Sequence, residues 1–504
     1  MISQSKKKIT KNYIYNSVYQ LFTMIIPLVT TPYISRVLLA EGVGKYSFTY
    51  SIVNYFILAA QLGFGYYAQR EIAKYQGNKH QQSIIFFEIL VDKGISVGLS
   101  SVVYACLCLL NIFGSYTTLM WWWLILLIAQ FFDVAFIFQG NEDFAKIVLR
   151  NFFIKILGIV LIFIFVRTEK DVWIYILSIA GSNLLGILST WPYLMQYIEK
   201  IEISELHPAR HWKATLKLFI PTIASVLYAY LDKTLIGLLI KETYEDNQVI
   251  IQNGVCQVIT VTKNYADLEN GYYEQAEKIV KVGMSLITAL GVVMLPRNTK
   301  EYSDGNVEIL KNNIYMAARF VFAIGIPIMF GLIGISNNLV PWFLGDNFIK
   351  SSIYLKMFTP LVILFGLENV FGIQYLVTTG QDGKYSVSIV SGTVINLVLN
   401  IVLIPFFWGY GAIVASVISE TIIVFMMYYC TRKAISFVRI LKDSWKYIIA
   451  GIAMFIAVYT TQTFLSANII HTVLLILEGV VVYLFVVILL KDEMIISLSR
   501  YIKK

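Results

Sequence analysis

Charged residues are scarce in this chain, and hydrophobic residues are abundant. The two classes account for 14% and 58% of its 504 residues, whereas a soluble globular domain contains roughly 25% charged residues. The chain therefore has more apolar surface than a soluble core of this size could bury, which excludes a water-soluble enzyme or binding domain. The net charge of +9 could suggest a nucleic-acid partner. The positive residues, however, lie in short loops between apolar runs, which is the pattern of membrane topology.

Cysteine and histidine are also scarce. The four cysteines have neither the spacing of a metal site nor that of a disulfide framework, and the four histidines are isolated from one another. A GxxxxGK[ST] phosphate-binding loop is absent, so ATP hydrolysis is not expected. We therefore expect no enzymatic activity, no cofactor and no metal site. The sequence does not open with the pattern of a cleaved signal peptide, so the first apolar segment is expected to be a retained helix.

Long apolar runs fill the rest of the chain. With about 20 apolar residues for each membrane crossing, the sequence predicts an all-α polytopic membrane protein with fourteen transmembrane helices. The predicted spans are 13–38, 47–67, 84–112, 119–139, 152–166, 172–197, 215–240, 276–296, 314–335, 356–378, 386–407, 410–430, 446–465 and 470–490. With this count, the basic clusters of the loops and of both ends of the chain fall on one side of the membrane, which predicts that both termini are cytoplasmic.

The first predicted helix carries a polar stripe. Asn12, Asn16 and Gln20 recur every four residues and so share one helical face. Pro27 and Pro32 remove two backbone donors further along, which membrane helices tolerate mainly beside other helices or a wet cavity. The helix is therefore expected to line a transport pathway. Asn16 and Gln20 are candidate ligands of a polar substrate, and they are equally suited to hydrogen-bond neighbouring helices.

Charges inside the predicted spans are a second set of candidates. An ionised side chain at the bilayer centre costs about 2.5–3.5 kcal/mol on insertion scales, so such residues usually have a function or a partner. Asp232 and Lys233 suit a pathway role and an ion pair with other helices equally well. Arg36 shares a helix with the polar stripe, which favours a pathway role. The intramembrane cations are Arg36, Lys93, Lys155, Lys233 and Arg319, and the anions are Glu88, Asp92, Asp133, Asp232, Glu368 and Glu420.

Residues 244–270 interrupt the helical pattern between the seventh and eighth spans. Asn253-Gly254 stands between two partly alternating, β-branched segments, which is the strongest short signal for a β-hairpin. We expect this hairpin on the outer face. A weak internal repeat further predicts two six-helix lobes, residues 1–214 and 215–430, followed by a basic cytoplasmic linker and two more helices in 431–504. Repeats related by an axis along the membrane normal place the transported molecule between the lobes.

The chain contains a set of distinctive segments, which include PLVTTPYISRVL at 27–38, REIA at 70–73, FQGNEDF at 138–144, GYYEQAEKIVKV at 271–282 and NLVLNIVLIPFFWGYGAIVASVISE at 396–420. These motifs resemble those of the Wzx-type polysaccharide flippases of the multidrug/oligosaccharidyl-lipid/polysaccharide exporter superfamily. The resemblance covers about residues 10–430. It implies that the chain moves undecaprenyl-pyrophosphate-linked oligosaccharide repeat units from the inner to the outer leaflet of a bacterial plasma membrane, for capsule, O-antigen or another surface glycan.

Such a substrate requires cations for its pyrophosphate and polar groups for its sugars. The candidate binding residues are Asn16, Gln20, Arg36, Lys93, Asp232, Lys233 and Arg319. An ion-coupled multidrug exporter of the same superfamily is the main alternative, although the intramembrane cations disfavour cationic drugs. An integral-membrane glycan polymerase is a third, but it would need a large outer loop with clustered charges. We expect the transporter to function as a monomer in the lipid membrane, near the polymerase machinery, with no nucleic-acid partner.

Overall fold

The computed structural model describes the backbone of residues 2–252 and 255–492. Within these ranges it describes all side chains except those of residues 2–25, 144–145, 217–218, 220–221, 246–261, 289–290 and 292–293. The described chain packs as two compact units, residues 1–234 and 235–504, which we call unit 1 and unit 2. The division falls inside a helix, and the lobe boundaries at residues 214 and 430 stay predictions.

Unit 1 consists of helices. They are α1 (Ile2–Gln61), α2 (Phe64–Lys74), α3 (Lys79–Leu109), η1 (Gly114–Tyr116), α4 (Thr117–Phe132), α5 (Ala135–Gly140), α6 (Phe144–Phe165), α7 (Val172–Leu188), η2 (Trp191–Gln196), η3 (Ile203–Glu205) and most of α8 (Trp212–Leu239).

Unit 2 begins with a β-hairpin, strands β1 (Thr243–Gln252) and β2 (Val255–Asn264). Its helices are α9 (Tyr265–Ser303), α10 (Val307–Leu344), η4 (Asp346–Phe348), α11 (Ser351–Phe358), α12 (Pro360–Glu368), the π-helical η5 (Asn369–Val377), α13 (Asp382–Thr431), α14 (Phe437–Gln462) and α15 (Ile469–Leu489).

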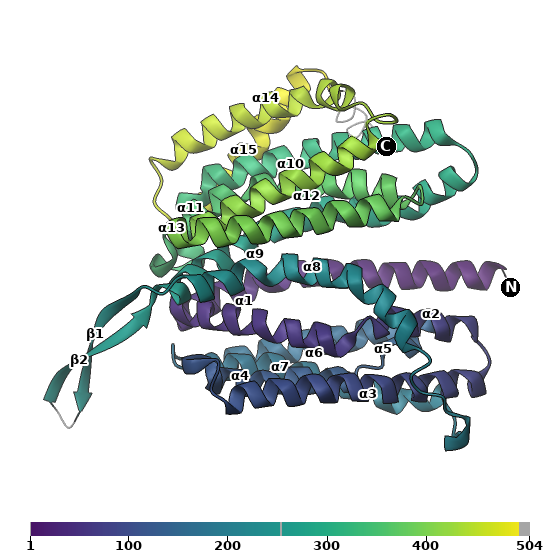
Figure 1. The fold of residues 1–504 in the computed structure, drawn as a ribbon. Helices are drawn as coiled ribbons and strands as arrows, with labels where there is room; N and C mark the ends of the chain where they lie inside the picture. Colours follow the sequence, from purple (N-terminus) through teal and green to yellow (C-terminus); the bar gives the residue numbers. More distant parts are fainter. Residues whose placement is uncertain (1, 253–254, 493–504) are drawn as a thin grey trace. The chain divides into compact units, whose positions relative to one another are not determined.

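Two of the helices are broken at a single residue. In α1 the break is Leu39, with φ 56° and ψ −178°, and in α13 it is Trp408, with φ 52° and ψ −132°. Both residues have the positive φ that side chains other than glycine rarely adopt. The chain reverses at each break, so each helix forms a hairpin of two limbs (Figure 1).

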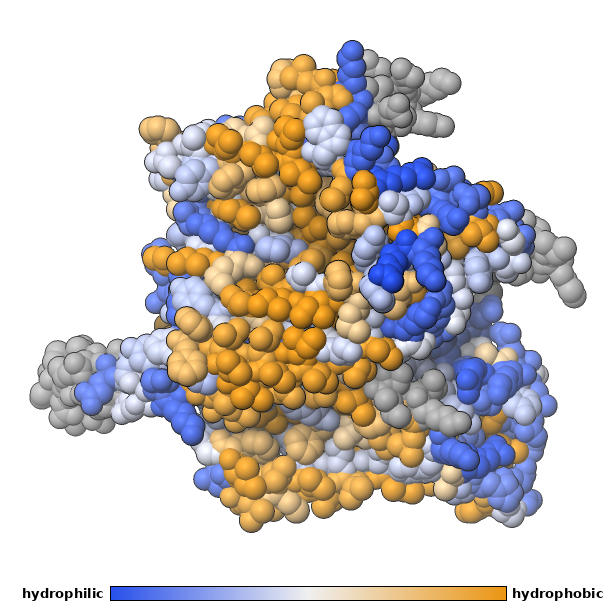
Figure 2. Space-filling view, turned by 45° about the horizontal axis from the view of Figure 1, so that its top comes forward, coloured by the Kyte–Doolittle hydropathy of each residue, from blue (hydrophilic) through white to orange (hydrophobic). Residues whose placement is uncertain are grey.

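The chain is a multi-pass membrane protein. Among the described residues, ten helical stretches are long and apolar enough to cross a membrane. When the two limbs of α1, the second limb of α13 and helix α9 are added to these ten, the helical stretches correspond one to one to the fourteen predicted spans. The prediction of an all-α polytopic fold is confirmed. Figure 2 shows hydrophobic side chains gathered over a broad part of the visible surface.

The predicted β-hairpin is present. β1 and β2 pair antiparallel, with Thr243 opposite Asn264 and Gln252 opposite Val255. The Asn253-Gly254 turn itself lies outside the described residues. The base of the hairpin is anchored by aromatic rings, because Tyr244 lies 4.9 Å from Tyr265 at the start of α9 (ring centroids).

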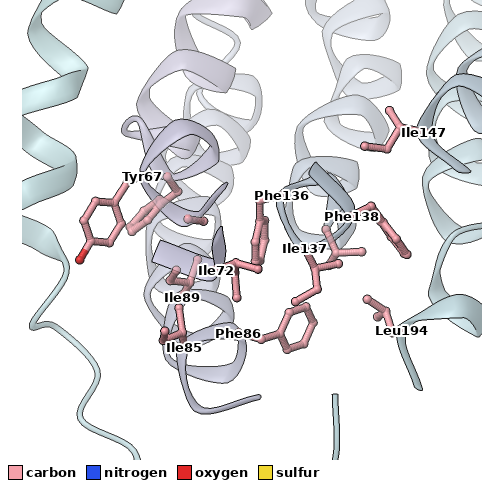
Figure 3. Packing of buried hydrophobic residues seen from close by; sticks show 13 residues of the cluster. Tyr67, Ile72, Ile85, Phe86, Ile89, Phe136, Ile137, Phe138, Ile147 and Leu194 are labelled. Carbon is pink, nitrogen blue, oxygen red and sulfur yellow. The ribbon is translucent and has the colours of Figure 1, made fainter. Parts of the chain in front are cut away.

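In unit 1, two of the motifs that suggested the resemblance pack against each other. Ile72 of REIA on α2 and Phe136, Ile137 and Phe138 before and within FQGNEDF on α5 belong to one buried cluster (Figure 3). A Cβ on Gly140 would lie only 2.7 Å from Ile72 and 2.9 Å from the backbone oxygen of Gln69. The two motifs therefore hold α2 against α5.

Candidate functional site

The clearest cluster of charges inside the helices of unit 1 surrounds Asp133, where α4 ends and α5 begins. Asp133 has extended backbone angles, φ −73° and ψ 102°, so it separates the two helices. Its Oδ1 accepts a hydrogen bond from Nη1 of Arg150 on α6 at 2.8 Å, and its backbone oxygen accepts one from Nζ of Lys93 on α3 at 2.6 Å. Three helices thus bring two cations to one acidic residue.

This cluster, Lys93, Asp133 and Arg150, has an excess of positive charge. One carboxylate and two cations leave a net charge of +1, and the cations are well buried, with Lys93 6% exposed and the side chain of Arg150 9% exposed. Asp133 keeps 29% of its side chain exposed. An uncompensated cation away from water is costly unless an anion joins it. The arrangement therefore suits the binding of a phosphate or diphosphate group.

Unit 1 also contains a cluster of aromatic side chains, most of which carry a hydroxyl or an indole N–H. Tyr46 and Tyr50 of α1 lie beside Trp123 of α4, with ring centroids 5.8 and 5.1 Å away. Tyr175 of α7 lies 4.7 Å from Tyr46, and Tyr230 of α8 lies 5.8 Å from Tyr50. Aromatic rings with hydroxyl groups at their edges combine an apolar face with a hydrogen-bonding tip. This combination suits the apolar faces and hydroxyl groups of sugars.

Six of the seven predicted binding residues belong to unit 1. Lys93 lies in the cluster around Asp133, and Arg36 has an exposed side chain on α1. Asp232 and Lys233 are both 6% exposed, next to Thr234 on α8, whose Oγ1 lies 3.0 Å from the hydroxyl of Tyr55 on α1. The side chains of Asn16 and Gln20 lie outside the described residues.

The seventh predicted residue, Arg319, lies in unit 2 in a different kind of environment. Its Nη2 donates a hydrogen bond to Oδ2 of Asp492 at 2.7 Å, and its Nε donates one to the hydroxyl of Tyr447 at 2.9 Å. Tyr447 in turn donates to the other oxygen of Asp492 at 3.1 Å. The group connects α10, α14 and the residues after α15, which favours a structural role for Arg319.

The predicted anions Glu88 and Asp92 of α3 hold the segment that leads into α8. Oε2 of Glu88 lies 2.6 Å from Nη2 of Arg210 and 2.9 Å from Nε2 of His211. Oδ1 of Asp92 accepts a hydrogen bond from the indole N–H of Trp212 at 2.9 Å. These carboxylates have protein partners of their own, which favours a structural role for both.

Two buried amides on α9 were missed by the sequence reasoning. Asn270 and Gln275 are fully buried, and neither the oxygen nor the nitrogen of either side chain makes a hydrogen bond within the described structure. A buried amide without a partner is destabilising by about 1–3 kcal/mol, so such groups call for an explanation. Gln275 belongs to the GYYEQAEK segment, and that membership was the signal that could have identified it.

A lysine of unit 1 is surrounded by rings next to the FQGNEDF segment. Nζ of Lys146 lies 3.0 Å from Oδ2 of Asp143 and 4.8 Å from the ring centroid of Tyr197. Tyr197 donates its hydroxyl to the same carboxylate oxygen at 2.6 Å. Burial and then the hydrogen bond to Asp143 raise the pKa of Tyr197, so its hydroxyl remains a donor that fixes Asp143.

Among the described residues, no group of three or more His, Cys, Asp or Glu side chains is placed to hold a metal ion.

Comparison with known proteins adds family information to this geometry. A family described as polysaccharide biosynthesis proteins matches residues 9–301. A protein of Escherichia coli (strain K12) named as a candidate O-antigen transporter is 23% identical over 432 residues, which cover 84% of this chain and 97% of that protein. The lipid II flippase MurJ of Bacillus subtilis (strain 168) is 30% identical over 145 residues, which cover 28% of this chain and 26% of that protein.

Two solved transporter structures share this fold. A structure of the lipid II flippase MurJ in an inward closed conformation matches with a TM-score of 0.69 and 15% identity, over 96% of this chain and 100% of that one. An inward-facing multidrug transporter of the MATE family matches with a TM-score of 0.59 and 16% identity, over 82% and 98% of the two chains. At these identities the likeness shows the fold alone.

Proposed function

Because the chain belongs to the family of polysaccharide biosynthesis proteins, we propose that it is a flippase for undecaprenyl-pyrophosphate-linked oligosaccharide repeat units. It would move these units from the inner to the outer leaflet of a bacterial plasma membrane during surface polysaccharide assembly. The transport would involve no covalent chemistry. The similarity to a candidate O-antigen transporter over 97% of that protein's length supports this class of substrate.

The observation that carries the proposal is the net positive charge around Asp133. A pyrophosphate diester carries negative charge that must leave water when the lipid crosses the bilayer, and desolvated anions bind strongly to preorganised ammonium and guanidinium donors. Lys93 and Arg150 offer such donors, while Asp133 neutralises only one of them. A transporter that selects cationic drugs would instead be expected to place an excess of carboxylates here.

The sugar part of the substrate would use different groups. Tyr50 and Tyr230, which are only partly buried, would offer ring faces for stacking on sugars and hydroxyl groups as donors and acceptors. Asp232 and Lys233 of α8, together with Arg36, Asn16 and Gln20 of α1, remain part of the proposed path. Two compact units joined at Thr234 and Leu235 fit alternating access by relative movement of the units.

The discriminating experiment is a deletion strain assayed for lipid-linked repeat units. A flippase deletion should accumulate these units on the inner leaflet and lose surface polysaccharide, and expression of the chain should reverse both effects. A strain with normal surface polysaccharide and raised drug sensitivity would instead support the multidrug exporter. Repeat units that accumulate unpolymerised on the outer leaflet would indicate a polymerase.

The purified chain provides a second test. Reconstituted into liposomes, it should expose a lipid-linked oligosaccharide diphosphate to an added membrane-impermeant glycan-modifying enzyme, and liposomes without the protein should not. We expect this activity from the monomer. A stable dimer that is required for flipping would contradict that part of the proposal.

A further inference from the structure

The first turns of α14 in unit 2 carry charged residues at one end of a membrane-spanning helix. α14 has 26 residues, which at 1.5 Å for each residue give a length of about 39 Å. The hydrocarbon core of a bilayer is only about 30 Å thick. The end of α14 that contains Arg439, Lys442 and Asp443 would therefore extend into the headgroup layer. The proposed transport path uses none of these residues.

One side of α14 is an exposed apolar row that runs along nearly the whole helix. Its members recur every three or four residues, so they share one helical face. They are Val438, Leu441, Trp445, Ile449, Ile452, Ile456 and Tyr459, each between 40% and 75% exposed. The opposite face is buried in unit 2 at Ser444 and Tyr447. Exposed apolar surface of this extent indicates contact with a membrane, so the row suits the acyl chains of lipids.

Basic residues form the next row around the same helix. Arg439, Lys442 and Lys446 each follow a member of the apolar row by one position, which places them beside it. Nζ of Lys446 donates a hydrogen bond to the backbone oxygen of Lys491 at 3.1 Å. Asp443 lies 3.9 Å from Nε of Arg439 and can neutralise at most one of the cations. The basic row therefore keeps a net positive charge next to apolar surface.

Two guanidinium groups at the corner between α13 and α14 are held in place by aromatic rings. The guanidinium carbon of Arg439 lies 4.1 Å from the centre of the Tyr315 ring on α10, and that of Arg432, directly after α13, lies 3.7 Å from the Tyr429 ring. The hydroxyl of Tyr315 also accepts a hydrogen bond from the backbone N–H of Ser436 at 2.9 Å. Stacking occupies the flat face of a guanidinium and leaves its N–H edge available to a phosphate.

We propose that this corner of unit 2 binds an anionic phospholipid of the surrounding bilayer. The headgroup phosphate would bond to Arg439 and Lys442, with Arg432 adding charge, and the acyl chains would lie along the apolar row from Val438 onward. A soluble anion would leave the apolar row unused. A zwitterionic lipid carries its own cation beside the phosphate, so it would gain less from the basic row. The proposal does not depend on what the chain transports.

Native mass spectrometry of the full chain tests this binding with phosphatidylglycerol and phosphatidylcholine in equal amounts. The wild type should retain phosphatidylglycerol in preference. The double variant Arg439→Gln/Lys442→Gln should bind it roughly 30-fold more weakly and should bind phosphatidylcholine as before. The matched control is Arg70→Gln/Lys74→Gln on α2, which removes two cations that are also more than half exposed but that lie beside Glu71. This control should keep the preference of the wild type.

Thermal unfolding in mixed micelles is the second measurement. Added phosphatidylglycerol should raise the melting temperature of the wild type and of the control, because a ligand that binds only the folded state stabilises it, and it should raise that of the double variant less. If the double variant fails to insert, Arg439→Lys takes its place and should lose part of the effect, since it keeps the charge without the fork. Equal retention of the two lipids by the wild type would overturn the proposal. Equal losses in the control and the double variant would also overturn it, because they would show diffuse attraction to any exposed cation.

Discussion

Arg319 and Asp492 form an ion pair with an N–O distance of 2.7 Å, 173 residues apart in the chain. Asp492 is fully buried and Arg319 keeps a quarter of its side chain exposed. Because Tyr447 bonds to both, the pair attaches α14 and the end of α15 to α10.

We therefore expect Arg319→Gln to reduce stability more than transport per molecule. Removal of the guanidinium leaves a buried carboxylate without its cation, which costs about 3–5 kcal/mol. Membrane abundance should fall, and surface polysaccharide should fall with it. The double variant Arg319→Gln/Asp492→Asn removes both charges and should recover abundance. If Arg319→Gln were present at normal abundance but did not transport, Arg319 would belong to the transport pathway after all.

Lys93→Gln should have the opposite profile. Arg150 still neutralises Asp133 in this variant, so abundance should stay near that of the wild type. Flipping should fall roughly tenfold or more, because a charged hydrogen bond to the diphosphate, worth about 1.5–3 kcal/mol, is lost. Arg150→Gln is the comparison, since it also removes the partner of the Asp133 carboxylate and should lower abundance. Wild-type flipping rates in Lys93→Gln would remove this residue from the proposed site.

Gln275→Leu should raise the melting temperature and impair flipping. The native amide is buried without a partner, so an apolar side chain of similar size should stabilise the protein by about 1–3 kcal/mol. We attribute the retention of the amide to hydrogen bonds with sugar in another state of the cycle. The control is Asn313→Leu, because Asn313 donates to Asn298 at 3.0 Å and its loss should destabilise. A stabilised Gln275→Leu variant with full activity would contradict the role in transport.

Gly140→Ala should destabilise unit 1. The added methyl group would lie 2.7 Å from Ile72 and 2.9 Å from a backbone oxygen, and such overpacking costs about 1–3 kcal/mol. Gly98→Ala on α3 is the matched control, since nothing lies within 4 Å of its Cβ position. Thermal unfolding in detergent should separate the two variants, and equal melting temperatures would show that α2 and α5 are not held as closely as described.

The orientation of the chain is tested with two tags. A reporter fused after Lys504 should be cytoplasmic, and an epitope inserted between Asn253 and Gly254 should be accessible from outside intact cells. The expectation follows from the basic loops, which favour the cytoplasmic side. Both tags on the same side would mean that one helix had been miscounted.

The helices were predictable because each needs only a local signal. An apolar run of sufficient length identifies a crossing, and Asn253-Gly254 between alternating segments identified the hairpin. The single-residue breaks were not predictable from the sequence, because leucine and tryptophan rarely adopt a positive φ and nothing near Leu39 or Trp408 marks a break. The polar start of α9, residues 265–275, was left outside the predicted span 276–296 because its burial depends on distant helices.

The charge clusters were only partly predictable for a related reason. Lys93 stood out as a cation within an apolar run, but Arg150 lies between the predicted spans 119–139 and 152–166 and was not a candidate. Its placement in α6, one helix away from Asp133, is a tertiary relationship that no spacing rule encodes. Arg319 was a pathway candidate because its ion-pair partner could not be identified from the sequence. That partner, Asp492, lies beyond the last predicted span, 470–490. Whether a buried charged residue is structural or belongs to the transport pathway depends on its partners in the fold, and these can be far away in the sequence.

The break at Trp408 also fixes the relative rotation of the two limbs of α13. Only one residue there departs from helical geometry, so the connection has no slack with which to absorb a change in length. Each residue of an α-helix turns the chain by about 100°. An insertion or deletion of one residue beside Trp408 would therefore turn the second limb by that angle and carry its buried face, with Ser419 and Glu420, out of the core of unit 2.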